Sequence, residues 1–160
     1  ARMANEIDGV SYIKLEDYPV LSKMSRIQKL APESIGIFGG LGGVYFLEEL
    51  QRGSRGIMTG FAFPEVLLEV YESFRGGDLE RAASVFDHYI SLIRYEFQPK
   101  IGLAYRKYIY HRRGVIESTF IRPPGMQIDD YTSAELVSII ERVGFSLDTI
   151  GVQRVQLTAS

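Results

Sequence analysis

Lys14 is the residue of this 160-residue chain whose type and position best fit covalent chemistry. It ends a short β-rich segment, residues 10–14 (VSYIK), which follows a turn-forming Asp-Gly pair. Active sites of parallel β/α folds lie at the carboxyl ends of strands, where partial burial of an amine lowers its pKa toward neutrality. A neutral amine can attack a ketone carbonyl and form a Schiff base. Position alone favours the ordinary alternative, a lysine whose ammonium group simply reaches solvent.

A glycine-rich loop, residues 39–43 (GGLGG), follows a second short apolar segment at residues 34–38. A strand, a glycine loop and a helix N-terminus together can cradle an anion. The loop nevertheless fits neither G-x-G-x-x-G nor a Walker A sequence, and no Lys-Ser or Lys-Thr pair follows it. Two interpretations stay open: backbone room for a substrate carboxylate, or a tight turn, which is the commoner use of glycine.

The remaining polar residues do not predict a metal or organic cofactor. His88 and His111 lie far apart on helical stretches, without carboxylates at metal-ligand spacing, so we expect structural or surface roles for both. Asp129 and Asp130 fit a turn better than paired acid catalysis. The chain has no cysteine, which excludes disulfides and thiolate zinc sites and favours a reducing, cytoplasmic setting.

Charge and hydropathy exclude two classes of partner. The 18 Lys and Arg residues nearly balance the 20 Asp and Glu residues, so the net charge of -2 gives no reason to expect nucleic acid. The apolar stretches are short and interrupted, so no membrane span is expected. One local exception is the helical stretch 100–113, which carries Lys100, Arg106, Lys107, Arg112 and Arg113 between tyrosines. We read it as a solvated face or a subunit contact, and it supports an alternative function as a non-catalytic helical interaction module.

Hydrophobic periodicity predicts a β/α pattern followed by helices alone. Short strands are expected at residues 10–14, 34–38 and 56–59, with helices at 20–31 and 44–52, the first capped by Asp17. Helices are then expected from Pro64 to Gly76, from a cap at Asp78 to residue 97, and over 101–113. A capping box at residues 132–135 (TSAE) predicts a last helix through residue 143. We expect one domain, with residues 1–63 forming part of a barrel and residues 64–160 its closing helix and helical extension.

Short, apolar, repeated strands are typical of parallel β/α architecture. Three β/α units cannot close a barrel, and a complete (β/α)8 barrel needs about 250 residues. The first residues (ARMANE) resemble neither a signal peptide nor a translation start, and read as the end of a helix. They favour the last part of a (β/α)8 barrel over a smaller open sheet.

Five short motifs occur in an order that resembles one enzyme family. They are residues 12–17 (YIKLED), 37–43 (IFGGLGG), 53–60 (GSRGIMTG), 76–79 (GGDL) and 122–124 (RPP). Together they resemble the lysine strand, the last two barrel strands and the C-terminal helical region of the dihydrodipicolinate synthase / N-acetylneuraminate lyase superfamily of class I Schiff-base enzymes. The resemblance covers roughly residues 1–145.

The resemblance implies a specific site. Lys14 would be the Schiff-base lysine, while Gly40 and Met58 would lie beside a bound keto acid through backbone atoms. The substrate would be pyruvate or another 2-keto acid, with no metal or cofactor, in a dimer or tetramer. The family's proton-relay tyrosine and carboxylate-binding loop come from the first half of the barrel, so this chain alone should be inactive. Tyr12, two residues before Lys14, shares its face of the strand but does not correspond to that tyrosine.

Overall fold

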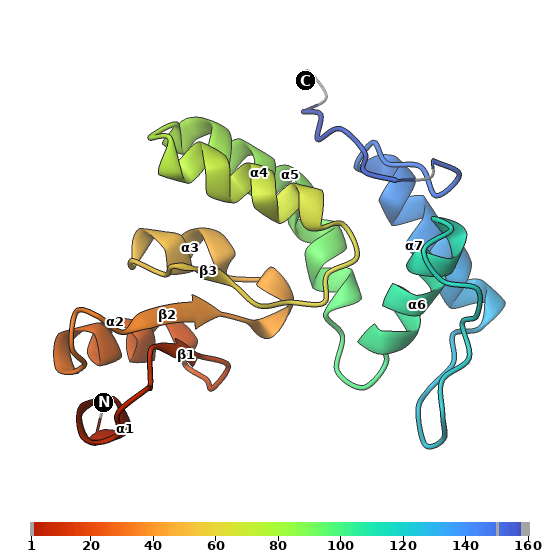
Figure 1. Cartoon of the computed structure of the whole chain (residues 1–160). Coiled ribbons are helices and arrows are strands. Elements are labelled where there is room, and N and C mark those ends of the chain that lie inside the picture. The colour runs from red at the N-terminus through yellow and green to blue at the C-terminus, as the bar shows by residue number, and fades with distance from the viewer. Residues whose placement is uncertain (1, 150, 158–160) are drawn as a thin grey trace. The chain divides into compact units, whose positions relative to one another are not determined.

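The computed structural model describes residues 2–149 and 151–157 and divides the chain into two compact units, Ala1–Thr59 and Gly60–Ser160 (Figure 1). The expectation of a single domain with an internal change at residue 63 stays a prediction.

The first unit is a parallel sheet with its helices. Along the chain it contains α1 (Arg2–Glu6), β1 (Tyr12–Lys14), α2 (Val20–Leu30), β2 (Gly36–Gly39), the 3-10 turn η1 (Leu41–Gly43), α3 (Phe46–Gln51) and β3 (Gly56–Ile57). The strand order is β1-β2-β3, and both neighbouring pairs are parallel. In the register, Phe38 of β2 lies opposite Lys14 of β1 and Gly56 of β3. The three predicted strands are therefore present and adjacent, in sequence order.

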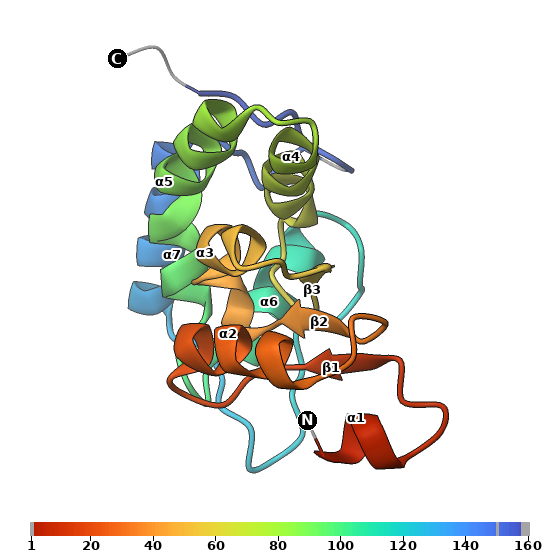
Figure 2. The ribbon, with the colours of Figure 1, turned by 90° about the vertical axis from the view of Figure 1, so that its left-hand side faces the viewer.

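The two faces of this sheet differ in burial. Figure 2 shows α2 and α3 along one side of the strands. The apolar side chains of the core between these helices and the sheet are Leu15, Val20, Met24, Ile37, Phe46 and Leu50, each at most 7% exposed. On the other face Tyr12 is 61% exposed and its ring contacts that of Phe38 at 5.3 Å between centroids. Because side chains alternate along a strand, Lys14 lies on this second, open face with Tyr12.

One predicted helix cap in this unit is wrong. Pro19 occupies the N-cap position of α2 with no side-chain hydrogen bond, and Asp17 instead pairs with Lys23 one turn into the helix. Proline has no N–H and a fixed φ suited to a helix start, so α2 begins without a polar cap.

The second unit is helical, with α4 (Pro64–Arg75), α5 (Leu79–Glu96), α6 (Gly102–Arg112) and α7 (Asp130–Arg142). The predicted cap of α5 is confirmed, because Asp78 accepts a hydrogen bond from the Arg81 N–H at 3.0 Å. The predicted capping box of α7 is wrong: Asp129 caps the helix and accepts from the Thr132 N–H at 2.7 Å. An aspartate three residues earlier therefore takes the role assigned to Thr132. Hydrogen bonds from the Thr132 side chain and N–H lower the pKa of Asp129.

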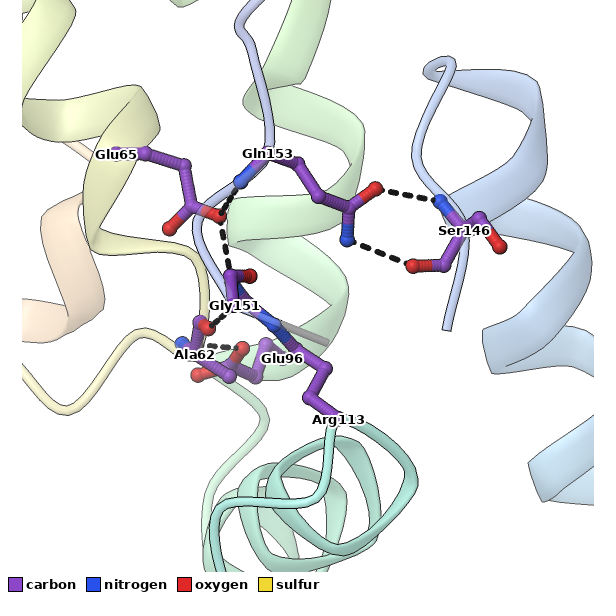
Figure 3. A network of polar contacts seen from close by, with 7 residues as sticks. All are labelled: Ala62, Glu65, Glu96, Arg113, Ser146, Gly151 and Gln153. Carbon is purple, nitrogen blue, oxygen red and sulfur yellow. Dashed lines mark hydrogen bonds and ion pairs between the residues drawn. The ribbon is translucent and has the colours of Figure 1, made fainter. Parts of the chain in front are cut away.

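A polar network fixes the segment that leads into α4 (Figure 3). The Ala62 N–H donates to Glu96 Oε2 at 2.9 Å, and the Ala62 carbonyl accepts from Arg113. Arg113 also pairs with Glu65 at 2.7 Å and donates to the Gly151 carbonyl at 2.7 Å. The network thus joins the start of α4, the end of α6 and the C-terminal segment.

This network also corrects the expectation for the basic helix. Arg113 is only 5% exposed, and Arg106 binds the buried Glu96 at 2.9 Å. Arg112 pairs with Asp148, and Lys107 binds the Phe120 carbonyl. Arg106 and Arg113 are thus engaged inside the unit, whereas Lys100 and Arg112 are exposed, and the alternative function stays a prediction.

Candidate functional site at the carboxyl edge of the sheet

The structure brings the three predicted site residues to one edge of the parallel sheet. Lys14 ends β1, Gly40 directly follows β2, and Met58 directly follows β3. Backbone hydrogen bonds continue past the strand ends, from the Leu15 N–H to the Phe38 carbonyl at 2.9 Å and from the Met58 N–H to the Gly39 carbonyl at 3.0 Å. Carboxyl edges are where parallel β/α folds place their sites. The role of each residue stays a prediction.

Lys14 is partly shielded at the end of β1. Its side chain is 41% exposed, and Nζ lies 3.3 Å from Glu16 Oε2. The partial burial expected for a lysine at a strand end is therefore seen, although the side chain still reaches solvent. The physical reason is the open face of the three-stranded sheet, where Tyr12 is also exposed. An ion pair with this much exposure contributes little to stability, because water and salt screen it.

Glu16 is the functional candidate that sequence reasoning missed. Its Oε1 accepts a hydrogen bond from the Leu41 N–H at 3.2 Å, while its Oε2 faces Lys14. The carboxylate therefore links the end of β1 to the start of η1. The available signal was the spacing of two between Lys14 and Glu16, which places both side chains on one face of an extended segment.

The glycine loop has a local explanation at each end. A Cβ built on Gly40 would lie 2.4 Å from Glu16 Oε1, so the absence of a side chain makes room for that carboxylate. Gly42 and Gly43 have φ values of 68° and 95°, in the region that favours glycine. These angles agree with the tight-turn interpretation, and room for a substrate carboxylate stays a prediction.

The backbone of Met58 is less free to bind a ligand than expected. Its N–H is already bonded to Gly39, while its side chain is 43% exposed. A ligand beside this residue would meet the thioether side chain or the carbonyl rather than the amide.

A second acid that the sequence did not predict lies in α3, next to Gly39. Glu49 of α3 is fully buried, and neither of its carboxylate oxygens has a hydrogen-bond partner of acceptable geometry among the described residues. Burial first, and then the charges of Glu48 and Glu16, raise its pKa to about 7, against a lowering by the nearby Gly40 N–H. An acid with these properties at a sheet edge is a functional candidate.

The two histidines have structural partners. His88 Nε2 lies 3.1 Å from the Val143 carbonyl, and His111 Nδ1 lies 3.2 Å from the Ile116 carbonyl. Within the part of the chain that the structure describes, no group of three or more histidine or acidic side chains is arranged to hold a metal ion. Over the same residues, no helix combines the length and the apolar character that crossing a membrane requires.

Comparisons with known proteins agree with the family that the motifs indicated. The chain is 31% identical over 144 residues to an L-2-keto-3-deoxyarabonate dehydratase of Azospirillum brasilense, a match that covers 89% of this chain and 46% of that protein. No model of a protein family matches the sequence.

Solved structures give the same result for the fold. A dihydrodipicolinate synthase from Rhodopseudomonas palustris matches with a TM-score of 0.77 and 35% identity, over 82% of this chain and 45% of that one. An N-acetylneuraminate lyase from Proteus mirabilis matches with a TM-score of 0.66 and 18% identity, over 82% and 44%. The chain spans about half the length of these proteins. The sequence resembles the dehydratase and the synthase, and the fold, part of a TIM barrel, resembles those of both solved structures.

Proposed function

We propose that this chain supplies the Schiff-base lysine of a (β/α)8 lyase that acts on pyruvate or another 2-keto acid. The observation that carries the proposal is the pairing of Lys14 with Glu16 at 3.3 Å, at the carboxyl edge shared with Gly40 and Met58. The names of its relatives, a dehydratase, a synthase and a lyase, support the same class of reaction.

The Lys14–Glu16 pair has the groups that imine formation requires. Glu16 first takes a proton from the Lys14 ammonium, leaving a neutral amine. The nitrogen lone pair then forms a bond to the keto carbon, and the proton lost by nitrogen moves to the carbonyl oxygen. Protonated Glu16 returns its proton to the resulting hydroxyl, which leaves as water and gives the iminium. Glu16 ends as it began, as a carboxylate beside a cation.

The iminium then draws electrons from the neighbouring carbon. Loss of a proton from C3 gives an enamine, which can add to an aldehyde, or the same steps can run in reverse as a cleavage. No metal or organic cofactor is needed, because the iminium is itself the electron sink.

The A. brasilense relative is named for a dehydration, and the position of Glu16 also allows a dehydration here. Its carboxylate can accept the C3 proton and then donate it to a hydroxyl on C4. Water leaves from C4 as the enamine electrons form a C3–C4 double bond and the nitrogen becomes an iminium again. A 2-keto-3-deoxy acid is the substrate class on which this reaction would act. Product analysis distinguishes dehydration from carbon–carbon cleavage.

The proposal includes partners for the open sheet face. The barrel strands that this chain lacks would cover Tyr12 and Phe38, supply the proton-relay tyrosine and remove Lys14 from water. By the same resemblance we expect a homo-oligomer in the cytoplasm, and an inactive chain when the remaining strands are absent.

Borohydride trapping tests the lysine directly in a complete barrel that contains this chain. Incubation with pyruvate and borohydride should add the mass of reduced pyruvate at Lys14. Lys14→Ala should abolish the adduct. The matched control is Lys23→Ala, which also removes a lysine paired with a carboxylate in the same unit and should leave the adduct intact. An unmodified Lys14 in the folded, complete barrel would overturn the proposal.

A further inference from the structure

The buried carboxyl of Glu49 has no evident structural use. Its side chain is 0% exposed and neither oxygen has a hydrogen-bond partner among the described residues. A buried acid without partners destabilises a fold, and an apolar side chain of similar volume would be more favourable there. Its presence therefore calls for an explanation outside packing.

The position of Glu49 connects it to the lysine through two glycines. A Cβ on Gly39 would lie 1.6 Å from Glu49 Oε2, and a Cβ on Gly40 would lie 2.4 Å from Glu16 Oε1. At each of these consecutive glycines, a carboxyl group occupies the space that a side chain would fill. Glu16 in turn faces Lys14 at 3.3 Å.

The charged surroundings of Glu49 are few. Glu48 and Glu16 both act to raise its pKa. Arg52, at the end of α3, is bound to Ser25 at 2.7 Å, and β3 consists of Gly56 and Ile57, which carry no charge. α2 carries its basic side chains Lys23, Arg26 and Lys29 at or near the surface, and none is among the causes that shift Glu49. Glu16 is therefore a group that acts on Glu49 and also pairs with Lys14.

We propose that Glu49 is a positioning residue that controls, through Glu16, when Lys14 gives up its proton. While Glu49 is neutral, Glu16 holds its negative charge easily and keeps Lys14 as the ammonium ion. When Glu49 ionises, its charge repels that of Glu16 and favours movement of the proton from Lys14 Nζ to Glu16 Oε2. The proton changes place within the pair, and no other bond forms or breaks. The inference rests on the proposed function, because it matters only if Lys14 is the nucleophile.

The pH dependence of adduct formation tests it in the complete barrel. The initial rate of borohydride-trapped pyruvate adduct should rise through an inflection near pH 7, where Glu49 ionises. Glu49→Gln keeps the volume and removes the charge, so it should lose this inflection. It should react about tenfold more slowly at pH 8, the change that about 1.4 kcal/mol of lost repulsion produces, with little change at pH 5.5. Glu49→Asp, which restores a carboxyl group, should recover the inflection.

Glu96→Gln is the matched control, since it removes another buried carboxyl whose pKa is near 7 but which lies in the other unit. Its adducts should keep the inflection, and circular dichroism should show that each variant is folded. Adduct formation in Glu49→Gln with the wild-type pH profile would overturn this inference and leave the Schiff base standing. Absence of any adduct at Lys14 in the wild-type barrel would instead overturn the proposed function.

Discussion

Two glutamates, Glu49 in the first unit and Glu96 in the second, are buried alike but differ in their partners. Glu49 is 0% exposed and Glu96 is 1% exposed, and burial is the main cause that raises the pKa of each to about 7. Both oxygens of Glu96 are used, one by Arg106 and one by the Ala62 N–H. Among the described residues, neither oxygen of Glu49 has a partner of hydrogen-bonding geometry, although the nearby Gly40 N–H lowers its pKa. Burial alone therefore does not distinguish the two acids, whereas the number of partnered oxygens does: both in Glu96 and neither in Glu49 among the described residues.

The same contrast holds for the units around them. In the second unit, Glu65 and Glu96 are each matched by an arginine, Arg113 and Arg106. Such pairs fix geometry, here that of the segment before α4 and the C-terminal segment (Figure 3). At the sheet edge of the first unit, Glu16 lies 3.3 Å from Lys14, whereas no cation pairs with Glu49 among the described residues.

The largest effect is expected from Arg113→Met. This change leaves Glu65 buried without its cation and removes the donor to the Ala62 and Gly151 carbonyls. Breaking a buried pair from one side costs about 3–5 kcal/mol of unfolding free energy, measured by urea denaturation. Arg113→Met with Glu65→Leu should recover part of the loss. A cost below about 1 kcal/mol for the single variant would show that the second unit does not depend on its matched pairs.

Arg113 also marks a limit of sequence-based prediction. Its neighbours in the chain are basic and aromatic, which is typical of a solvated helix face. Its partner Glu65 lies 48 residues earlier, and no local pattern connects the two. The strands, most helices and the Asp78 cap could be predicted because they depend on neighbours within one or two turns. The Asp129 cap was missed because Thr132, in the same turn, is an equally good candidate.

The candidate site divides in the same way. The place of Lys14 at a strand end, and of Gly40 and Met58 at the next two, follows from the order of elements in a parallel sheet. The exposure of Lys14 could not be predicted, because it depends on what covers the sheet. Glu49 was missed because two acids in the first turn of a helix are ordinary, and only the fold shows that one of them is pressed against Gly39.

Gly39→Ala is expected to have an intermediate effect. The new methyl group would overlap Glu49 Oε2, and the buried acid has no free space into which it could move. We expect a loss of about 1–3 kcal/mol, as for other overpacked interiors, in thermal or urea unfolding. In a Glu49→Ala background the methyl group should cost much less, because the carboxyl is gone.

Gly40→Ala is the contrasting variant. A Cβ there meets Glu16, whose side chain is 47% exposed and free to turn into solvent. Its stability should therefore change less than that of Gly39→Ala, while the Lys14–Glu16 pair should be disturbed. Equal costs for the two alanines would contradict the difference in confinement between the two carboxyl groups.

The smallest and most diagnostic effect is the pH dependence of stability in Glu49→Gln. A carboxyl whose pKa is about 7 in the folded chain and 4.5 when unfolded binds more protons in the folded state between these values. The stabilisation that the protonated Glu49 provides is therefore complete below pH 4.5 and is lost as the pH rises to about 7. The loss is at most about 3 kcal/mol, since one pKa unit corresponds to about 1.4 kcal/mol. Glutamine removes this loss but buries an amide whose donors lack partners, so the net gain at pH 8 should be about 1 kcal/mol.

Glu96→Gln should change the free energy of unfolding at pH 8 in the opposite direction, so the two substitutions are best measured together. Glu96 also has a raised pKa, but its replacement gives up the ion pair with Arg106, so the variant should be less stable at pH 8 than the wild type. Urea unfolding of both variants at pH 5.5 and pH 8 measures the pair. If both substitutions lowered stability at pH 8 by similar amounts, Glu49 would have a stabilising partner that its surroundings do not show, and the argument for its functional role would lose its physical basis.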